Sequence, residues 1–194
     1  MNNSYQEYLN FSHKLADAAS ETSMQYFRTS LDIDNKSDDS PVTIADKNTE
    51  LKIRSLVEKE YPNHGILGEE FDSSNPDADF VWVIDPIDGT RSYIAGHKDF
   101  GNLISLTHNK KPIIGIINCP AHNERWVGVI NQQSTYNHEP ANTSEVKNIE
   151  DAYLFTSGLY FEEPQLRNAV DKINKKVRYY RYGGDCYMYG MLTS

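Results

Sequence analysis

The segment VWVIDPIDGT, residues 81–90, carries two carboxylates, Asp85 and Asp88, at the exit of an apolar run. Pro86 between them fixes one backbone dihedral and removes an N–H group. Two carboxylates held this close repel each other unless a cation lies between them, and such hard oxygen ligands suit Mg²⁺ or Mn²⁺ better than zinc. Gly89 and Thr90 then open a turn or short helix whose N–H groups can receive a phosphate oxygen. The segment therefore predicts a metal site beside an anion site.

Three more acidic residues precede this segment. Glu69 and Glu70 end another predicted strand, and Asp46 lies in the first turn of a predicted helix. If the two strands are neighbours, Asp46 and Glu69 meet the first two carboxylates in one crevice at the carboxyl ends of the strands, where open α/β sheets bind ligands. Each motif alone is typical of a solvated turn or a surface face. Their ordered combination predicts a cation-binding crevice.

The spacing of apolar residues predicts the elements that must position this crevice. Helices are expected over residues 5–28, 45–60 and 163–175, and strands over residues 65–69, 80–85, 102–107, 112–118, 125–129, 152–156 and 177–182. Residues 32–41 form a predicted loop, and residues 130–151 a hairpin tip or a long loop. A last helix begins at Asp185, which is a good N-cap. The middle of the chain is therefore a sheet, and residues 152–182 have the rhythm of an α/β unit.

The composition excludes several classes of protein. The 194 residues include 19 Lys or Arg and 28 Asp or Glu, a formal net charge of −9, without the basic cluster that a nucleic-acid backbone requires. No apolar run is long enough to span a membrane and the N-terminus has no signal-peptide pattern, so we expect a soluble, cytoplasmic protein. Cys119 and Cys186 lack metal-ligand spacing and are expected to be buried thiols.

The ordered motifs VTIAD (42–46), GEE (68–70) and WVIDPIDGT (82–90) resemble the signature of the inositol monophosphatase superfamily, whose members are metal-dependent phosphomonoesterases. Segments 91–96, 124–128 and 182–187 look most like the histidinol-phosphatase branch. The resemblance implies an α+β or α/β layered sandwich with alternating helix and sheet layers. Residues 1–130 would form an N-terminal α+β domain that contains the metal and phosphate site, and residues 131–194 would begin a C-terminal α/β domain.

The resemblance also implies metal ligands. Glu69, Asp85 and the carbonyl of Ile87 would hold a first Mg²⁺ ion, and Asp85 and Asp88 would share a second. Glu69 would help to hold a third ion, and Mn²⁺ is a possible substitute for Mg²⁺. Lys36 stands where the family often places a basic residue near these ions.

Catalytic and substrate-binding roles follow from the same resemblance. Asp46 and Thr90 would orient and deprotonate the attacking water, and the N–H groups of Gly89 and Thr90 would bind the phosphate. Asp185 would either cap its helix or contact a cationic amine of the substrate. The full set of predicted substrate contacts is Glu69, Asp88, Gly89, Thr90, Arg91 and Asp185.

These roles favour Mg²⁺-dependent hydrolysis of a small phosphomonoester, with L-histidinol phosphate, from histidine biosynthesis, as the preferred substrate. Inositol 1-phosphate or a broader range of sugar phosphates is the alternative within this class. Family members typically continue beyond the GGDCY segment at 183–187 and supply another metal-binding Asp there. We therefore expect a C-terminally truncated chain whose full-length form is a homodimer. An inactive remnant that binds metal or phosphate is the alternative from another class.

Overall fold

A mixed sheet forms the centre of the computed structural model, which describes residues 5–30, 33–35, 41–156, 158 and 163–193. The strands lie in the order β3-β4-β5-β6-β7-β8-β9. Their bounds are β3 Gly65–Gly68, β4 Phe80–Asp88, β5 Gly101–His108, β6 Lys111–Cys119, β7 Glu124–Val129, β8 Thr135–Tyr136 and β9 Glu139–Pro140. Strand β3 runs parallel to β4, and each later neighbour is antiparallel. The structure confirms the predicted strands of the middle segment.

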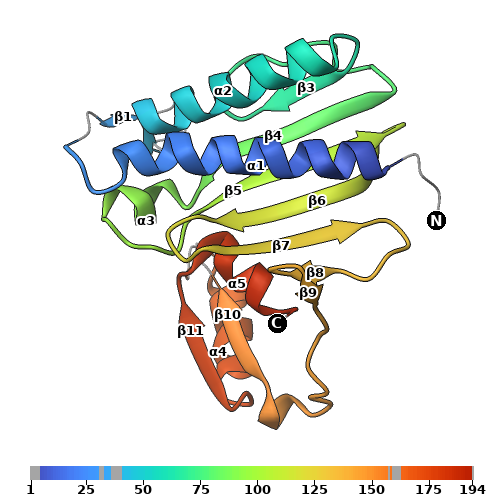
Figure 1. Ribbon diagram of the computed structural model, residues 1–194. Helices are drawn as coiled ribbons and strands as arrows, with labels where there is room; N and C mark the ends of the chain where they lie inside the picture. Colours follow the sequence, from blue (N-terminus) through green and yellow to red (C-terminus); the bar gives the residue numbers. More distant parts are fainter. Residues whose placement is uncertain (1–4, 31–32, 36–40, 157, 159–162, 194) are drawn as a thin grey trace.

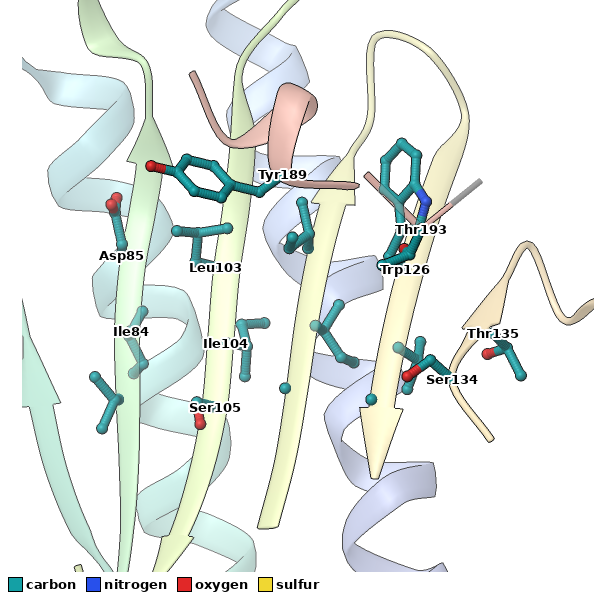
Figure 2. A pocket seen from close by; sticks show the side chains of 16 residues that line it. Ile84, Asp85, Leu103, Ile104, Ser105, Trp126, Ser134, Thr135, Tyr189 and Thr193 are labelled. Carbon is teal, nitrogen blue, oxygen red and sulfur yellow. The ribbon is translucent and has the colours of Figure 1, made fainter. Parts of the chain in front are cut away.

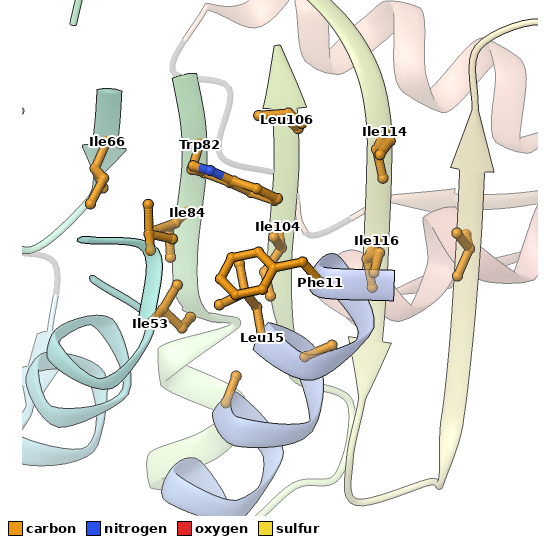
Figure 3. Close-up of a cluster of buried hydrophobic side chains, with 14 of the residues drawn as sticks. Phe11, Leu15, Ile53, Ile66, Trp82, Ile84, Ile104, Leu106, Ile114 and Ile116 are labelled. Carbon is orange, nitrogen blue, oxygen red and sulfur yellow. The ribbon is translucent and has the colours of Figure 1, made fainter. Parts of the chain in front are cut away.

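Two long helices, α1 (Gln6–Tyr26) and α2 (Ile44–Glu60), lie across one face of this sheet (Figure 1). Both were predicted from the helical spacing of their apolar residues. Figure 3 shows their buried side chains meeting those of the strands: Phe11, Leu15, Ile53, Ile66, Trp82, Ile84, Ile104, Leu106, Ile114 and Ile116. This interface is the main core, and it fixes the N-terminal end of α2 above the carboxyl end of β4.

The segment before α2 departs from the prediction. Residues 32–41 were expected to form a loop, whereas β1 (Ile33–Asn35) and β2 (Pro41–Thr43) form an antiparallel pair. A strand of three residues is too short to show the alternation of apolar and polar residues from which strands are predicted. Lys36 lies outside the described residues.

The chain after β9 forms a smaller part that lies below the main sheet in Figure 1. Residues 130–151 were predicted to form a hairpin tip or a long loop. There, β8 and β9 make a hairpin at the edge of the main sheet, and a 3₁₀ turn, η1 (Ile149–Asp151), follows. Strands β10 (Tyr153–Thr156) and β11 (Tyr179–Tyr182) pair in parallel on either side of α4 (Pro164–Asn174) in the sequence, which confirms the α/β rhythm. Helix α5 (Asp185–Met191) follows.

Two further sequence-based expectations can be compared with the fold. Cys119 and Cys186 are free and buried, as predicted. Among the described residues, no helix is long and apolar enough to cross a lipid bilayer.

Candidate active site

The first turn of α2 holds Asp46 through a capping box. Thr43 is the N-cap residue, and its Oγ1 accepts a hydrogen bond from the Ala45 backbone N–H at 3.1 Å. The Oδ2 atom of Asp46 accepts two hydrogen bonds from Thr43, from the backbone N–H at 2.8 Å and from the hydroxyl at 2.6 Å. Asp46 is buried, and this reciprocal arrangement leaves its Oδ1 atom directed elsewhere.

That second oxygen meets Thr90, 44 positions later in the chain. Thr90 begins the short helix α3 (Thr90–Ile94), and its hydroxyl can donate to Asp46 Oδ1 at 3.3 Å or to the Ile87 carbonyl at 3.1 Å. Burial raises the pKa of Asp46, while the hydrogen bonds from Thr43 and Thr90 act in the opposite direction. A carboxylate of raised pKa in contact with a hydroxyl is a suitable proton acceptor.

The parallel pairing of β3 and β4 brings Glu69 beside Asp85. Gly68 is paired with Ile84, the last pair between β3 and β4. Glu69 and Asp85 each follow a member of this pair, so they lie at the same height at the end of the two strands. The pKa of Asp85 is raised to about 9, first by burial and then by the negative charges of Glu69 and Asp88. Its Oδ1 atom is buried and has no hydrogen-bond partner.

Asp88 lies beyond an irregularity in the β4–β5 ladder, where the register shifts between Asp85 and Asp88. Its Oδ2 atom accepts a hydrogen bond of 2.6 Å from the backbone N–H of Cys186, which is 98 positions away in the first turn of α5. Burial raises the pKa of Asp88, although the contact with Cys186 lowers it. Helix α5 thus reaches the second carboxylate of the DPID segment.

Gly89 and Asp185 lie against each other. Gly89 has φ = +85°, and a Cβ atom there would lie 2.7 Å from Oδ2 of Asp185. The same Oδ2 accepts a hydrogen bond of 2.6 Å from the Ser92 hydroxyl. Asp185 was expected as a possible N-cap of its helix, but it is the first helical residue, and the N-cap is Gly184 at φ = +97° with no side-chain cap. Its partner Ser92 lies on α3, so the capping prediction was wrong.

The remaining site predictions lie around this centre. Arg91 is exposed on α3, and the Glu69 side chain is exposed at the end of β3. Ile87 is buried among Ala45, Tyr93 and Phe100, which leaves its carbonyl as the group that faces Thr90. Sequence analysis missed the contacts of Ser92 and of the Cys186 N–H, because their partners are more than 90 positions away.

Residues 4–194 match the inositol monophosphatase family. The chain belongs to this family. The match includes each of the residues described above. It confirms both the recognition made from the sequence motifs and the fold class expected from them.

Individual relatives carry related names. The chain is 41% identical over 182 residues to a chloroplastic protein of Arabidopsis thaliana named bifunctional phosphatase IMPL2, covering 93% of this chain and 53% of that protein. It is 35% identical over 183 residues to the histidinol-phosphatase of Chlorobaculum parvum, covering 93% of this chain and 71% of the relative. The chain therefore spans about half the length of the Arabidopsis relative.

A solved structure shares the fold. The inositol monophosphatase of Zymomonas mobilis superposes with a TM-score of 0.86 at 42% sequence identity, over 98% of this chain and 74% of the other. This similarity places the mixed sheet and its two covering helices in the inositol monophosphatase fold.

The donor set of this family member fits a hard divalent cation. Asp85 has a buried oxygen without a partner, and the side chains that raise its pKa are the carboxylates of Glu69 and Asp88. A divalent ion would give that oxygen a partner, since Mg²⁺ prefers oxygen ligands. Its positive charge would offset the repulsion between the three carboxylates. In the described part of the chain, however, no three His, Cys, Asp or Glu side chains form a ready-made metal cage. The carboxylates are suitable ligands for the ion, and their side chains would have to move closer together to bind it.

An apolar cavity of about 470 Å³ adjoins this centre on the sheet face opposite α1. In Figure 2, Asp85 lies at one end of the cavity beside Tyr189, and the rest of the lining comes mainly from apolar side chains of β4 to β7. Asp46 and Thr90 are not among its lining residues. The polar crevice and the apolar cavity therefore meet at Asp85 but are separate features.

Proposed function

We propose that this chain carries the catalytic centre of a Mg²⁺-dependent phosphomonoester hydrolase. The observation that carries the proposal is the buried, unpartnered Oδ1 of Asp85, close enough to Asp46 for the charge of Asp46 to raise the pKa of Asp85. A cation site beside a hydroxyl–carboxylate pair is the arrangement that hydrolysis of a phosphate ester by water requires. The names of the Arabidopsis and Chlorobaculum relatives support the same class of reaction.

The acidic side chains would hold the ions. Glu69, Asp85 and the Ile87 carbonyl would bind one Mg²⁺, Asp85 and Asp88 a second, and Glu69 would take part in a third. When bound, the ions would neutralise the phosphate dianion and make water a stronger nucleophile. The contact from the Cys186 N–H holds one oxygen of Asp88, so its other oxygen remains for a ligand.

The hydroxyl of Thr90 would pass a proton from water to Asp46. Its lone pairs accept a hydrogen from the attacking water while its own proton goes to Asp46 Oδ1, 3.3 Å away. The water oxygen forms a bond to phosphorus, the bond from phosphorus to the alcohol oxygen breaks, and that oxygen takes a proton from solvent. Thr43 occupies the other oxygen of Asp46 and fixes the orientation of the carboxylate.

The substrate would be bound around the first turn of α3. The N–H groups of Gly89 and Thr90 would receive phosphate oxygens, and Arg91 would add a positive charge. Asp185 and Asp88 would be the acidic groups that contact an amine on the leaving group. The preferred substrate is L-histidinol phosphate, a cationic amine ester, and the histidinol-phosphatase of Chlorobaculum parvum supports this choice.

Inositol 1-phosphate is the second candidate, because the solved structure of 42% identity is an inositol monophosphatase. Phosphate release from both esters with Mg²⁺ would distinguish them, with Asp85→Asn as the inactive control. Faster release from histidinol phosphate is expected. Faster release from the inositol ester would reverse the substrate choice, and an unchanged rate in Asp85→Asn would reject the enzyme proposal.

A further inference from the structure

Helix α2 contains a charged pair that the proposed reaction does not use. Glu50 is fully buried, with 0% of its surface exposed, and Arg54 one turn later is 8% exposed. Nε of Arg54 lies 2.7 Å from Oε1 of Glu50. Taking both charges out of water is unfavourable unless further hydrogen bonds complete the pair.

Those further bonds all go to one segment, the turn that follows β3. Oε2 of Glu50 accepts a hydrogen bond of 2.8 Å from the Glu70 backbone N–H. Nη2 of Arg54 donates to the Phe71 carbonyl at 3.1 Å and to the Asp72 carbonyl at 3.0 Å. The pair therefore binds the backbone on the C-terminal side of Glu69.

The same carboxylate also meets the backbone on the other side of Glu69. A Cβ atom at Gly68 would lie 1.9 Å from Oε1 of Glu50, so only glycine allows this approach. Glu69 is consequently held between two residues that contact a single buried carboxylate. Its own side chain is exposed and lies close enough to Asp85 to raise the pKa of that residue.

We propose that Glu50 and Arg54 are positioning residues that hold Glu69 at the level of Asp85, so that the metal ligands of the two strands are in place before an ion arrives. The inference rests on the proposed function, because it takes Glu69 as a metal ligand. Neither Glu50 nor Arg54 would be a ligand of the ion, because their described contacts are with each other and with the backbone. Their effect passes through the backbone of residues 68–72.

The test compares Mn²⁺ binding to the whole 194-residue chain, followed by electron paramagnetic resonance, in Glu50→Gln, Arg54→Lys and Gly68→Ala. Each variant should bind Mn²⁺ about ten- to a hundredfold more weakly, the usual effect of losing a group that supports a metal ligand. Hydrogen exchange at the Glu70 amide should become faster in Glu50→Gln and Arg54→Lys. Gly68→Ala keeps both charges and tests the close approach separately.

Two matched controls separate positioning from general loss of stability. Ile53→Val removes a buried methylene from the same helix, and Gly115→Ala adds a Cβ where nothing lies within 4 Å. Both should keep the Mn²⁺ affinity of the unaltered chain. Equal affinity in all variants, or an equal loss in Ile53→Val at matched unfolding temperature, overturns the inference. Failure of the unaltered chain to hydrolyse either ester while it still binds Mn²⁺ rejects the proposed function alone.

Discussion

At the scale of single residues, the two oxygens of Asp46 have different partners. Oδ2 completes the capping box with Thr43, and Oδ1 meets the Thr90 hydroxyl. One side chain thus caps a helix and contacts the hydroxyl to which we assign proton transfer. VTIAD has the spacing of a capping box, so the sequence alone can indicate the first contact. The contact with Thr90 was expected only from the resemblance to the family.

Replacement of Thr90 tests the proton path. Thr90→Val keeps the shape of the side chain but removes the hydroxyl, so phosphate release should fall by about 10²–10⁴-fold, the usual contribution of a positioned acid or base. Thr90→Ser keeps the hydroxyl and should retain most of the rate. The unfolding temperature of each variant checks the fold. Equal activity of the valine and serine variants would show that Thr90 transfers no proton.

Replacement of Gly89 tests the close approach of α5. Gly89→Ala places a side chain at φ = +85°, where L-residues lose about 1–2 kcal/mol in stability. The new Cβ also collides with Asp185, so the loss measured by urea denaturation should exceed the backbone value. Gly89→Ala combined with Asp185→Ala should recover part of the difference. Additive losses in the double variant would mean that the two residues do not touch.

At the scale of the elements, a buried amide network joins α1, β5, β6 and the DPID segment. Nδ2 of Asn102 donates to the Pro86 carbonyl at 2.7 Å, and its Oδ1 accepts a hydrogen bond of 2.8 Å from Asn118. Asn118 in turn donates to Ser20 on α1 at 2.8 Å. A side chain of β5 therefore holds the irregular backbone between Asp85 and Asp88 through the Pro86 carbonyl.

Asn102→Leu should destabilise the chain. The substitution leaves the Pro86 carbonyl and an amide proton of Asn118 without this partner, and an unpaired buried polar group costs about 1–3 kcal/mol in stability. The free energy of unfolding in urea measures the loss. Asn10→Ala, an exposed change on α1, serves as the control and should lie within about 0.5 kcal/mol of the unaltered chain. A similarly small effect of Asn102→Leu would show that the network contributes little.

Local periodicity predicted most elements, because regular spacing reports which face of a helix or strand is buried. It did not show that β3 and β4 are neighbours, and the meeting of Glu69 with Asp85 was expected only on that condition. It missed β1 and β2, because strands of three residues, Ile33–Asn35 and Pro41–Thr43, are too short to show an alternation of apolar and polar residues. It also gave no role to Glu50 and Arg54, since an acid and a base four positions apart are more often a solvated helix face. Contacts between distant residues, such as Asp88 with Cys186, have no local pattern.

At the scale of the whole molecule, the net charge of −9 includes carboxylates that burial makes costly to ionise. Asp85 has an ordinary pKa of 3.8, raised to about 9 in the folded protein. A raised pKa in the folded state means that the folded protein binds the proton more tightly than the unfolded chain does. The stabilisation from this proton is fully present below pH 3.8 and is lost as the pH rises through about 9.

Metal-free protein in a chelator should therefore lose stability between pH 5 and pH 8 in urea denaturation. Asp85→Asn has no such charge and should lose less over the same interval, with Asp46 and Asp88 accounting for what remains. Mg²⁺ in place of the chelator should stabilise the unaltered chain at pH 8, by about 2.7 kcal/mol at a hundred times its dissociation constant. Parallel pH curves for the two proteins would contradict this assignment, because the loss would then arise away from Asp85.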